Sequence, residues 1–182
     1  MRPLQAENRL VWLDLEMTGL DPEKHTILEI ATAITDNDLQ VLAEGPCLTI
    51  HHSEEELSGM DPWCVEQHGK SGLTERARRS SVTAAEAQAR TLEFVAQYCL
   101  PAQAPLCGNT IGQDRRFLVK YMPRLHDYFH YRSIDVSSVK ELVQRWYPSS
   151  HYVYSKNQQH MAREDVRDSI AELAYYRKTV FR

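Results

Sequence analysis

The chain has 182 residues, of which 42% are hydrophobic and 25% are charged, and this composition suits a globular domain. Its formal net charge of −4 disfavours a broad basic face that would bind long nucleic acid. No apolar run approaches the roughly 20 residues of a membrane span, and residues 1–10 resemble neither a signal peptide nor a transit peptide, so we expect one domain over residues 1–182, in the cytoplasm and away from membranes. No CxxC pair or zinc-like spacing occurs, which predicts free thiols in a reducing compartment at Cys47, Cys64, Cys99 and Cys107.

Three strands are predicted first. Arg9–Leu15 and Ile27–Thr35 are apolar runs of strand length that are rich in β-branched residues. Val41–Ile50 is a third candidate, which Gly45-Pro46 is expected to break. The polar residues 36–38 between the last two runs predict a hairpin turn. The chain is therefore expected to begin as an antiparallel three-stranded sheet.

Helical periodicity predominates after the third strand. Pro62–His68 is predicted to be a short helix with Asp61 as its N-cap and Gly69 as its stop. Thr83–Tyr98 is predicted to be a longer amphipathic helix, because Thr83 followed three residues later by Glu86 forms a capping box.

Short strands and helices alternate in the rest of the chain. We expect strands at Pro105–Cys107 and Ile134–Val136, and helices at Gln113–Met122, Val136–Trp146 and Glu164–Lys178. The polar segment at 147–159 has no apolar period and is expected to be a functional lid or to be disordered. One domain of mixed strands and helices follows from this pattern.

Two acidic residues stand at the end of the first predicted strand. Asp14 and Glu16 flank Leu15, and side chains two positions apart on a strand point to the same side. Burying two carboxylates together is costly unless something positive compensates, and a hard divalent cation is the natural compensator. The alternative is that both carboxylates face solvent, which Trp12 on the same face argues against.

Further acidic residues stand near the starts of two predicted helices. Asp114 follows a turn in which Gly108 and Gly112 suit close backbone approach; alternatively, it is a favourable dipole partner at a helix N-terminus. His160 lies in a polar loop five residues before Asp165, which opens the last helix, so the two side chains are able to converge. Taken alone, such a histidine is more often structural or exposed.

Together these residues predict a two-metal site. Four carboxylates, from Asp14, Glu16, Asp114 and Asp165, are able to hold two Mg²⁺ or Mn²⁺ ions about 4 Å apart. Such ions activate a water for attack on phosphorus and stabilise the leaving oxygen, and His160 beside that water is a reasonable general base. The arrangement suits in-line cleavage of a phosphodiester, and two divalent cations would bring the formal charge from −4 to zero.

This order of residues resembles that of the DEDDh exonucleases of the ribonuclease-H-like superfamily, and most closely that of the oligoribonuclease family. The likeness runs from about Arg9 to Arg177 and is carried by long segments, among them WLDLEMTGLDPEKHTILEIAT, CGNTIGQDRRFLVKYMP and YFHYRSIDVSSVKEL. It implies an α/β fold with a central mixed five-stranded sheet flanked by helices, a homodimer, and 3′→5′ removal of nucleotides from RNA of two to a few residues. It assigns the four carboxylates as metal ligands and His160 as the general base.

The resemblance also implies which residues bind the substrate. Leu20 would act as a wedge between two bases, Trp63 would pack at a base, and Tyr131 would reach in from the second subunit. The 5′ phosphate would be bound by the hydroxyls of Thr110 and Ser137 and by the guanidinium of Arg132. Groups of this kind suit charge-assisted hydrogen bonds to a phosphate. Without the resemblance, each residue has an ordinary structural interpretation. Trp63 would be a core residue, Leu20 would be a loop residue with no special role, and Arg132 would form a surface ion pair.

Two alternative functions remain open. A related DEDDh exonuclease that acts on longer RNA or DNA would share the metal site, but the acidic balance and the phosphate-binding set favour short single-stranded RNA, with no DNA partner. A non-catalytic nucleotide-binding module with the same fold would not need all five catalytic residues. Elsewhere, the run at 54–56 is expected to be a solvated loop or the start of a helix, and Arg76, Arg78 and Arg79 are expected to form an exposed face.

Overall fold

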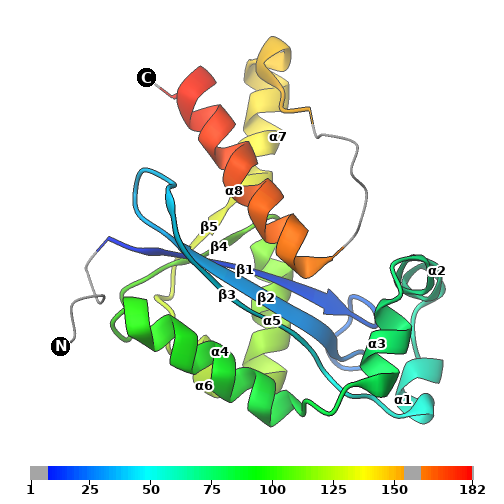
Figure 1. Ribbon diagram of the computed structural model, residues 1–182. Helices are drawn as coiled ribbons and strands as arrows, with labels where there is room; N and C mark the ends of the chain where they lie inside the picture. The colour runs from blue at the N-terminus through cyan, green and yellow to red at the C-terminus, as the bar shows by residue number, and fades with distance from the viewer. Residues whose placement is uncertain (1–7, 154–160, 182) are drawn as a thin grey trace.

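The computed structural model of the protein describes residues 8–153 and 161–181. Its frame is a sheet of five strands, β1 (Leu10–Met17), β2 (Ile27–Thr35), β3 (Val41–Thr49), β4 (Leu106–Gly108) and β5 (Ser133–Asp135). The strand order is β3-β2-β1-β4-β5 (Figure 1). β2 lies between β1 and β3 and pairs antiparallel with both, whereas β4 and β5 extend the sheet from β1 in parallel. The expected mixed five-stranded sheet is confirmed.

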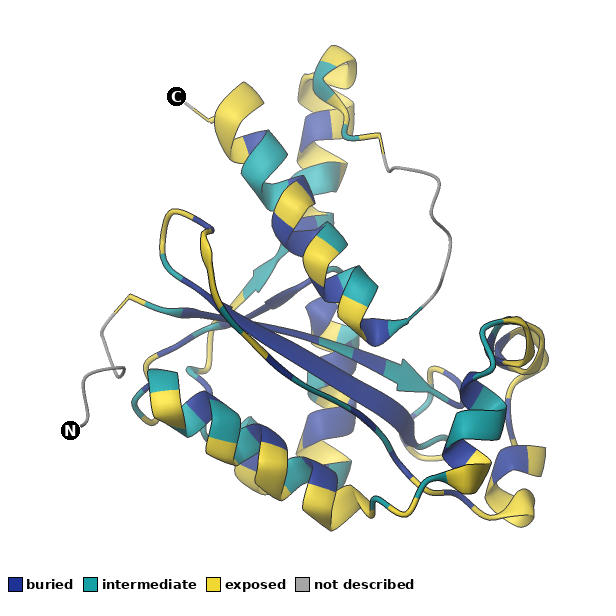
Figure 2. Cartoon of the chain, in the orientation of Figure 1, coloured by how far each residue is buried: buried dark blue, intermediate teal, exposed yellow. Residues whose placement is uncertain are grey.

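β1 is the middle strand of the sheet, and helices cover both of its faces. Strand alternation sends Val11 and Leu13 to one face and Trp12 to the other, and all three side chains are buried. The same alternation places Asp14 and Glu16 on the face of Trp12. Figure 2 shows the resulting buried centre of the sheet, with exposed residues on the outer surfaces of the flanking helices.

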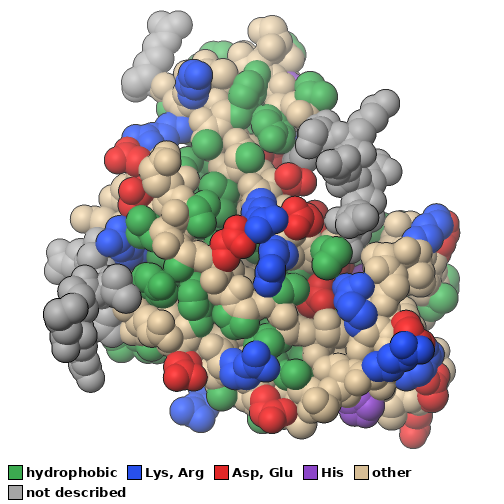
Figure 3. All heavy atoms as spheres, viewed as in Figure 1, with side chains coloured by type: hydrophobic (Ala, Val, Ile, Leu, Met, Phe, Trp, Pro, Cys, Tyr) green, Lys and Arg blue, Asp and Glu red, His purple; other side chains and the backbone are tan. Residues whose placement is uncertain are grey.

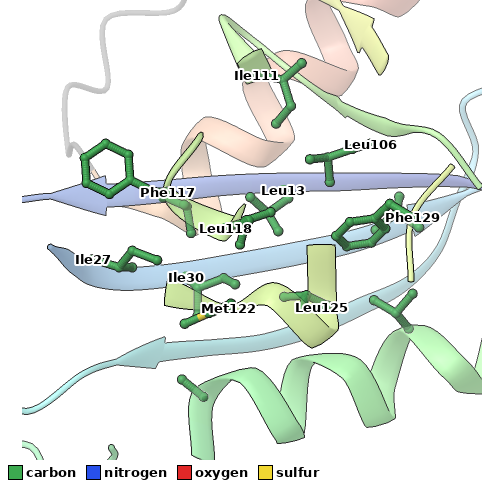
Figure 4. Close-up of a cluster of buried hydrophobic side chains, with 14 of the residues drawn as sticks. Leu13, Ile27, Ile30, Leu106, Ile111, Phe117, Leu118, Met122, Leu125 and Phe129 are labelled. Atoms are coloured by element: carbon green, nitrogen blue, oxygen red, sulfur yellow. The ribbon is translucent and has the colours of Figure 1, made fainter. Parts of the chain in front are cut away.

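Three helices cover the face of the sheet that contains Leu13: α4 (Ala84–Tyr98), α5 (Ile111–Tyr121) and α6 (Pro123–His126). Phe117 and Leu118 of α5 and Leu125 of α6 join Leu13 and Ile30 of the strands in one hydrophobic cluster (Figure 4). This packing orients α5, so the first turn of that helix is held at the end of β1.

The opposite face is covered by α7 (Val136–Trp146) and by α8 (Ala162–Thr179), which crosses β1 and β2 (Figure 1). Trp12 packs in a cluster with Val166 and Ile170 of α8. Its indole N–H donates to Thr35 Oγ1 at 3.0 Å, which satisfies the buried polar group. A short 3₁₀ turn at Pro148–Ser150 follows α7.

Three short helices surround the carboxyl end of β1: α1 (Glu54–Ser58), α2 (Pro62–Lys70) and α3 (Leu73–Arg79) (Figure 1). They share a small core that includes Leu28, Leu57 and Leu73. The backbone N–H of Asp61 donates to the carbonyl of Thr18 at 2.8 Å, so the start of α2 is tied to the loop after β1.

Most predicted elements are confirmed, several with bounds shifted by one or two residues, and two predicted interruptions differ. The strand predicted to break at Gly45-Pro46 is continuous, because a bulge absorbs the irregularity: Ala31 pairs with Cys47, and Ala33 pairs with Glu44. β3 is also an edge strand, where a proline is tolerated. The helix predicted to stop at Gly69 continues to Lys70, and the left-handed residue is Gly72.

The remaining expectations are met, apart from a small shift in the start of one helix. Thr83 and Glu86 form the predicted capping box at the start of α4. α5 begins at Ile111, two residues before the predicted start. All four cysteines are free. Among the described residues, no helix is long and apolar enough to cross a membrane.

Candidate active site

Three carboxylates that are distant in the sequence meet at the end of β1. Asp14 and Glu16 point from β1 toward α8, and Asp165 lies in the first turn of α8. One carboxylate oxygen from each of the three residues lies within 4.8 Å of the others. The structure therefore brings three of the four predicted metal ligands together.

The fourth predicted ligand, Asp114, lies in the first turn of α5 and is almost fully buried. Its Oδ1 accepts a hydrogen bond from the backbone N–H of Leu15 at 2.9 Å. Leu15 separates Asp14 from Glu16 in the sequence, so this bond fixes Asp114 against the strand that carries the other two carboxylates.

The carboxylates repel one another where little water can screen them. Burial, followed by the charges of Asp114, Glu16, Asp165 and Glu29, raises the pKa of Asp14 well above its ordinary value. Burial, followed by Asp165 and Glu29, raises the pKa of Glu16 to about 8. Burial raises the pKa of Asp114 as well, against the opposing effect of its backbone hydrogen bonds. Arg76 lowers the pKa of Glu16, but among the described residues the neighbouring carboxylates and burial outweigh it, so the ionised cluster is short of positive charge.

These donors fit a hard divalent cation. All of them are carboxylate oxygens, which suit Mg²⁺ or Mn²⁺ rather than a thiophilic metal. The convergence of three oxygens and the raised pKa values of the cluster both indicate a place where positive charge would be strongly stabilised.

A buried glutamate that sequence reasoning missed lies beside this cluster. Glu29 of β2 is 2% exposed and is the direct cross-strand partner of Glu16. Its Oε2 accepts from Thr49 Oγ1 at 2.6 Å and faces Arg76 Nη2 at 3.4 Å. Its Oε1 has no hydrogen-bond partner among the described residues. Arg76 thus borders the site, and the prediction that it lies on an exposed face is wrong. The methylene stem of its side chain lets the guanidinium reach the buried carboxylate of Glu29.

A buried histidine also borders the cluster. His68 Nε2 lies 2.9 Å from the carbonyl oxygen of Met17, and because a carbonyl only accepts, this nitrogen carries a proton. The other ring nitrogen lies 3.9 Å from Glu16 Oε2. His68 therefore docks α2 onto the end of β1 next to Glu16.

The two residues expected to contact bases are exposed near the end of β1. Leu20 is 69% exposed and Trp63, at the start of α2, is 63% exposed, so neither is a core residue. The amide of Gln113 on α5 donates to the carbonyl oxygen of Leu20 and holds that loop. The Asp61 N–H bond to Thr18 described above brings the Trp63 segment to the same loop.

Two of the three predicted phosphate-binding residues are in contact. Thr110 Oγ1 and Ser137 Oγ lie 3.0 Å apart, and Asp135 Oδ1 accepts the backbone N–H groups of both residues at 3.0 Å. The guanidinium of Arg132 lies 5.0 Å from the centre of the Tyr131 ring, a cation–π contact. Tyr131, which the resemblance predicts to act on a second subunit, is 73% exposed.

One predicted catalytic residue, His160, lies outside the described residues, as do residues 154–159 of the segment expected to be a lid. The described chain resumes at Met161, directly before α8.

Comparison with known proteins identifies the family. The sequence matches the RNase_T exonuclease family over residues 11–173. It is 57% identical over 178 residues to the oligoribonuclease of Pseudoalteromonas atlantica, covering 98% of each chain. It is 54% identical over 177 residues to the oligoribonuclease of Vibrio cholerae, covering 97% of this chain and 98% of the relative. The chain belongs to the oligoribonuclease family. This membership confirms the expected enzyme class, a hydrolytic 3′→5′ exoribonuclease.

Solved structures confirm the ribonuclease-H-like fold. Exonuclease I from Methylocaldum szegediense is similar with a TM-score of 0.71 at 18% identity, over 94% of this chain and 41% of that one. Escherichia coli exonuclease I in complex with a 5cy-dT13 oligonucleotide is similar with a TM-score of 0.73 at 17% identity, over 96% of this chain and 42% of that one. This chain thus corresponds to less than half of those longer proteins.

Of the two site residues that the sequence did not predict, only Glu29 stands in a pattern that could have indicated it. Glu29 is the only charged residue in the nine-residue run ILEIATAIT, which is buried throughout. A lone carboxylate in such a strand is rarely accommodated without a partner. His68 carried no comparable signal, because its contact with Met17 depends on how α2 docks.

Proposed function

We propose that this exoribonuclease degrades RNA of two to a few nucleotides to mononucleotides, at a two-metal site formed by Asp14, Glu16, Asp114 and Asp165. The observation that carries the proposal is the convergence of three carboxylate oxygens within 4.8 Å. The short substrate is supported by the relatives named oligoribonuclease. We further propose that residues 1–182 act as one exonuclease domain in the cytoplasm.

The four carboxylates would hold two divalent cations, Mg²⁺ or Mn²⁺. When bound, such ions activate the attacking water and stabilise the leaving oxygen of an in-line displacement at phosphorus. His160 would accept the proton of the attacking water as the general base. The hydrogen bond from Leu15 and the strand geometry hold the acidic side chains in place, so little reorganisation is needed when the substrate binds.

Substrate length would be measured at the other end of the site. Thr110, Ser137 and Arg132 would form the site for the 5′ phosphate, in which Thr110 and Arg132 would donate charge-assisted hydrogen bonds. Leu20 and Trp63 would contact the bases, with stacking on the aromatic ring stabilising each base by about 1–3 kcal/mol. The mixture of acidic and basic side chains on the face shown in Figure 3 also suits a short substrate, since that face has no continuous basic track over its described residues.

The test compares cleavage of a 5′-phosphorylated diribonucleotide, a seven-mer and a twenty-mer, each with Mn²⁺ and with EDTA. We expect fast, metal-dependent loss of the dinucleotide and slow attack on the twenty-mer. Metal-dependent cleavage that favours the twenty-mer would keep the metal site, overturn length measurement, and favour the alternative, an exonuclease for longer RNA or DNA. An Asp114→Ala protein that cleaves as well as the parent would refute the assigned site.

We also propose a homodimer in which the partner subunit's Tyr131 completes each site. The exposure of this side chain supports the proposal. Two inactive variants, Asp14→Ala and Tyr131→Ala, are mixed and allowed to exchange subunits. A mixed dimer contains one subunit with an intact metal site facing an intact Tyr131, so activity should reappear. A fully active monomer, or no recovery in confirmed mixed dimers, would refute the shared site.

A further inference from the structure

A buried polar network joins α8 to the proposed phosphate-binding hydroxyls. Glu172 of α8 has no solvent exposure. Its Oε2 accepts from Asn109 Nδ2 at 3.1 Å, and its Oε1 accepts from the Tyr176 hydroxyl at 2.8 Å. Lys140 Nζ lies 3.2 Å from Oε1. Three donors thus converge on this side chain, as an ionised carboxylate requires.

Glu172 determines which way the Asn109 amide faces. A carboxylate accepts hydrogen bonds and donates none, so the amide nitrogen of Asn109 must face Glu172. The same nitrogen also donates to Ser169 Oγ at 3.0 Å. The amide oxygen of Asn109 therefore faces Ser137, whose Oγ lies 3.0 Å away. Because that oxygen only accepts, the Ser137 hydroxyl donates its single proton to Asn109.

This direction has a consequence for Thr110. Ser137 Oγ lies 3.0 Å from Thr110 Oγ1 and accepts the Thr110 backbone N–H at 3.0 Å. With the proton of Ser137 given to Asn109, the Thr110 hydroxyl must be the donor of the pair. Thr110 is exposed, and a hydroxyl rotates freely about its C–O bond, so its proton can turn from Ser137 to a phosphate oxygen.

We propose that Glu172 is a positioning residue for recognition of the substrate's 5′ phosphate. It fixes the direction of the hydrogen bonds through Asn109 and Ser137, and this leaves the Thr110 hydroxyl as the donor to the phosphate. The inference rests on the proposed phosphate-binding role of Thr110, and it makes the part of Ser137 in that site indirect, because the Ser137 proton is given to Asn109. The backbones of these two residues are held separately by Asp135, so Glu172 controls the direction of the protons rather than the location of the chain.

The test measures KM for a diribonucleotide with a 5′ phosphate and for the same dinucleotide with a 5′ hydroxyl, in the full-length protein with Mn²⁺. The phosphate is expected to lower KM in the parent. In Glu172→Gln, the neutral amide lets the Asn109 side chain face either way, and the KM advantage of the phosphate should fall about tenfold, or about 1.4 kcal/mol. Arg177→Ala is the matched control on α8: it removes a surface ion pair with Asp38 and should leave the ratio unchanged.

A direction swap separates this role from a structural one. Combining Asn109→Asp with Glu172→Gln moves the carboxylate to position 109, where it accepts from Ser137 as the amide oxygen did, and moves the donor amide to position 172. The net charge and the direction of the Ser137 bond are both kept, while the bond between positions 109 and 172 is reversed, so the phosphate advantage should return to within about twofold of the parent. Asn109→Asp alone places two carboxylates together and should lose the advantage.

The outcomes distinguish the two proposals. A parent protein with equal KM for both dinucleotides would overturn the phosphate-binding role itself. A parent that prefers the phosphate, with an undiminished preference in folded Glu172→Gln, would overturn the role of Glu172 alone. So would a folded double variant that does not regain the preference. If thermal unfolding shows that Glu172→Gln does not fold, the comparison of the double variant with the parent decides the question.

Discussion

The metal-free protein should become less stable as the pH rises from 5 to 8. Glu16 carries the effect, because its pKa is raised from the ordinary 4.5 to about 8 in the folded chain, chiefly by burial. A carboxyl group with a raised pKa binds its proton more tightly when folded. Its stabilising contribution is therefore fully present below pH 4.5 and is lost as the pH rises through about 8.

The expected size is large enough to measure. A tenfold change in proton affinity corresponds to about 1.4 kcal/mol, so ionising Glu16 between pH 5 and pH 8 should cost the folded state about 3 kcal/mol. Asp14 acts in the same direction. For a domain of this size, about 3 kcal/mol corresponds to a fall of roughly 10 °C in the melting temperature. A divalent cation should remove most of this fall, since it binds the ionised cluster.

The assay is thermal unfolding across this pH range in EDTA and in Mn²⁺, for the parent and for Glu16→Gln. The variant is the control, because it retains every other titrating group and loses only the Glu16 carboxyl. Glutamine mimics the protonated carboxyl, so in EDTA the two proteins should have similar stability at pH 5, and the parent should fall below the variant by about 3 kcal/mol as the pH rises to 8. If the parent and the variant show the same pH dependence, the raised pKa of Glu16 has no energetic consequence and the reasoning fails.

Other predictions test the surroundings of the site. Glu29→Gln removes a charge that raises the pKa of Glu16, so the midpoint of the EDTA pH profile should move to lower pH; a midpoint that rises would contradict this. Gly108→Ala would place a Cβ atom 2.8 Å from the backbone oxygen of Leu13 and should lower the unfolding free energy by about 1–3 kcal/mol in urea. Gly112→Ala is its control, because nothing lies within 4 Å of the new atom; Gly112 is the second residue of α5, and alanine there should stabilise the protein by at most about 0.5–1 kcal/mol. Both glycines were expected to allow a close backbone approach, but the structure shows one only at Gly108. A loss of stability in Gly112→Ala would show that position 112 is crowded as well.

Local patterns in the sequence were sufficient for most elements of the fold. The β-branched run at 27–35 forms a strand with the predicted bounds, and the segment at 136–146 forms the predicted helix. The capping box of Thr83 and Glu86 also forms as expected, because it depends only on residues three positions apart. The main errors, at Gly45-Pro46 and at Gly69, occurred where packing kept a strand or helix running through residues that usually interrupt it.

The sequence by itself predicted the residues that we propose to carry the chemistry. Strand alternation alone put Asp14 and Glu16 on the face of Trp12, and the family motifs supplied Asp114, His160 and Asp165. What surrounds those residues was decided only by the tertiary structure. Burial of Glu29 against Glu16 requires β2 to pair with β1, and the path from Glu172 to Thr110 requires α8 to lie against the end of β4. Side chains so far apart in the sequence meet only after the sheet and its covering helices have assembled, and no local pattern records the direction of the hydrogen bonds between them.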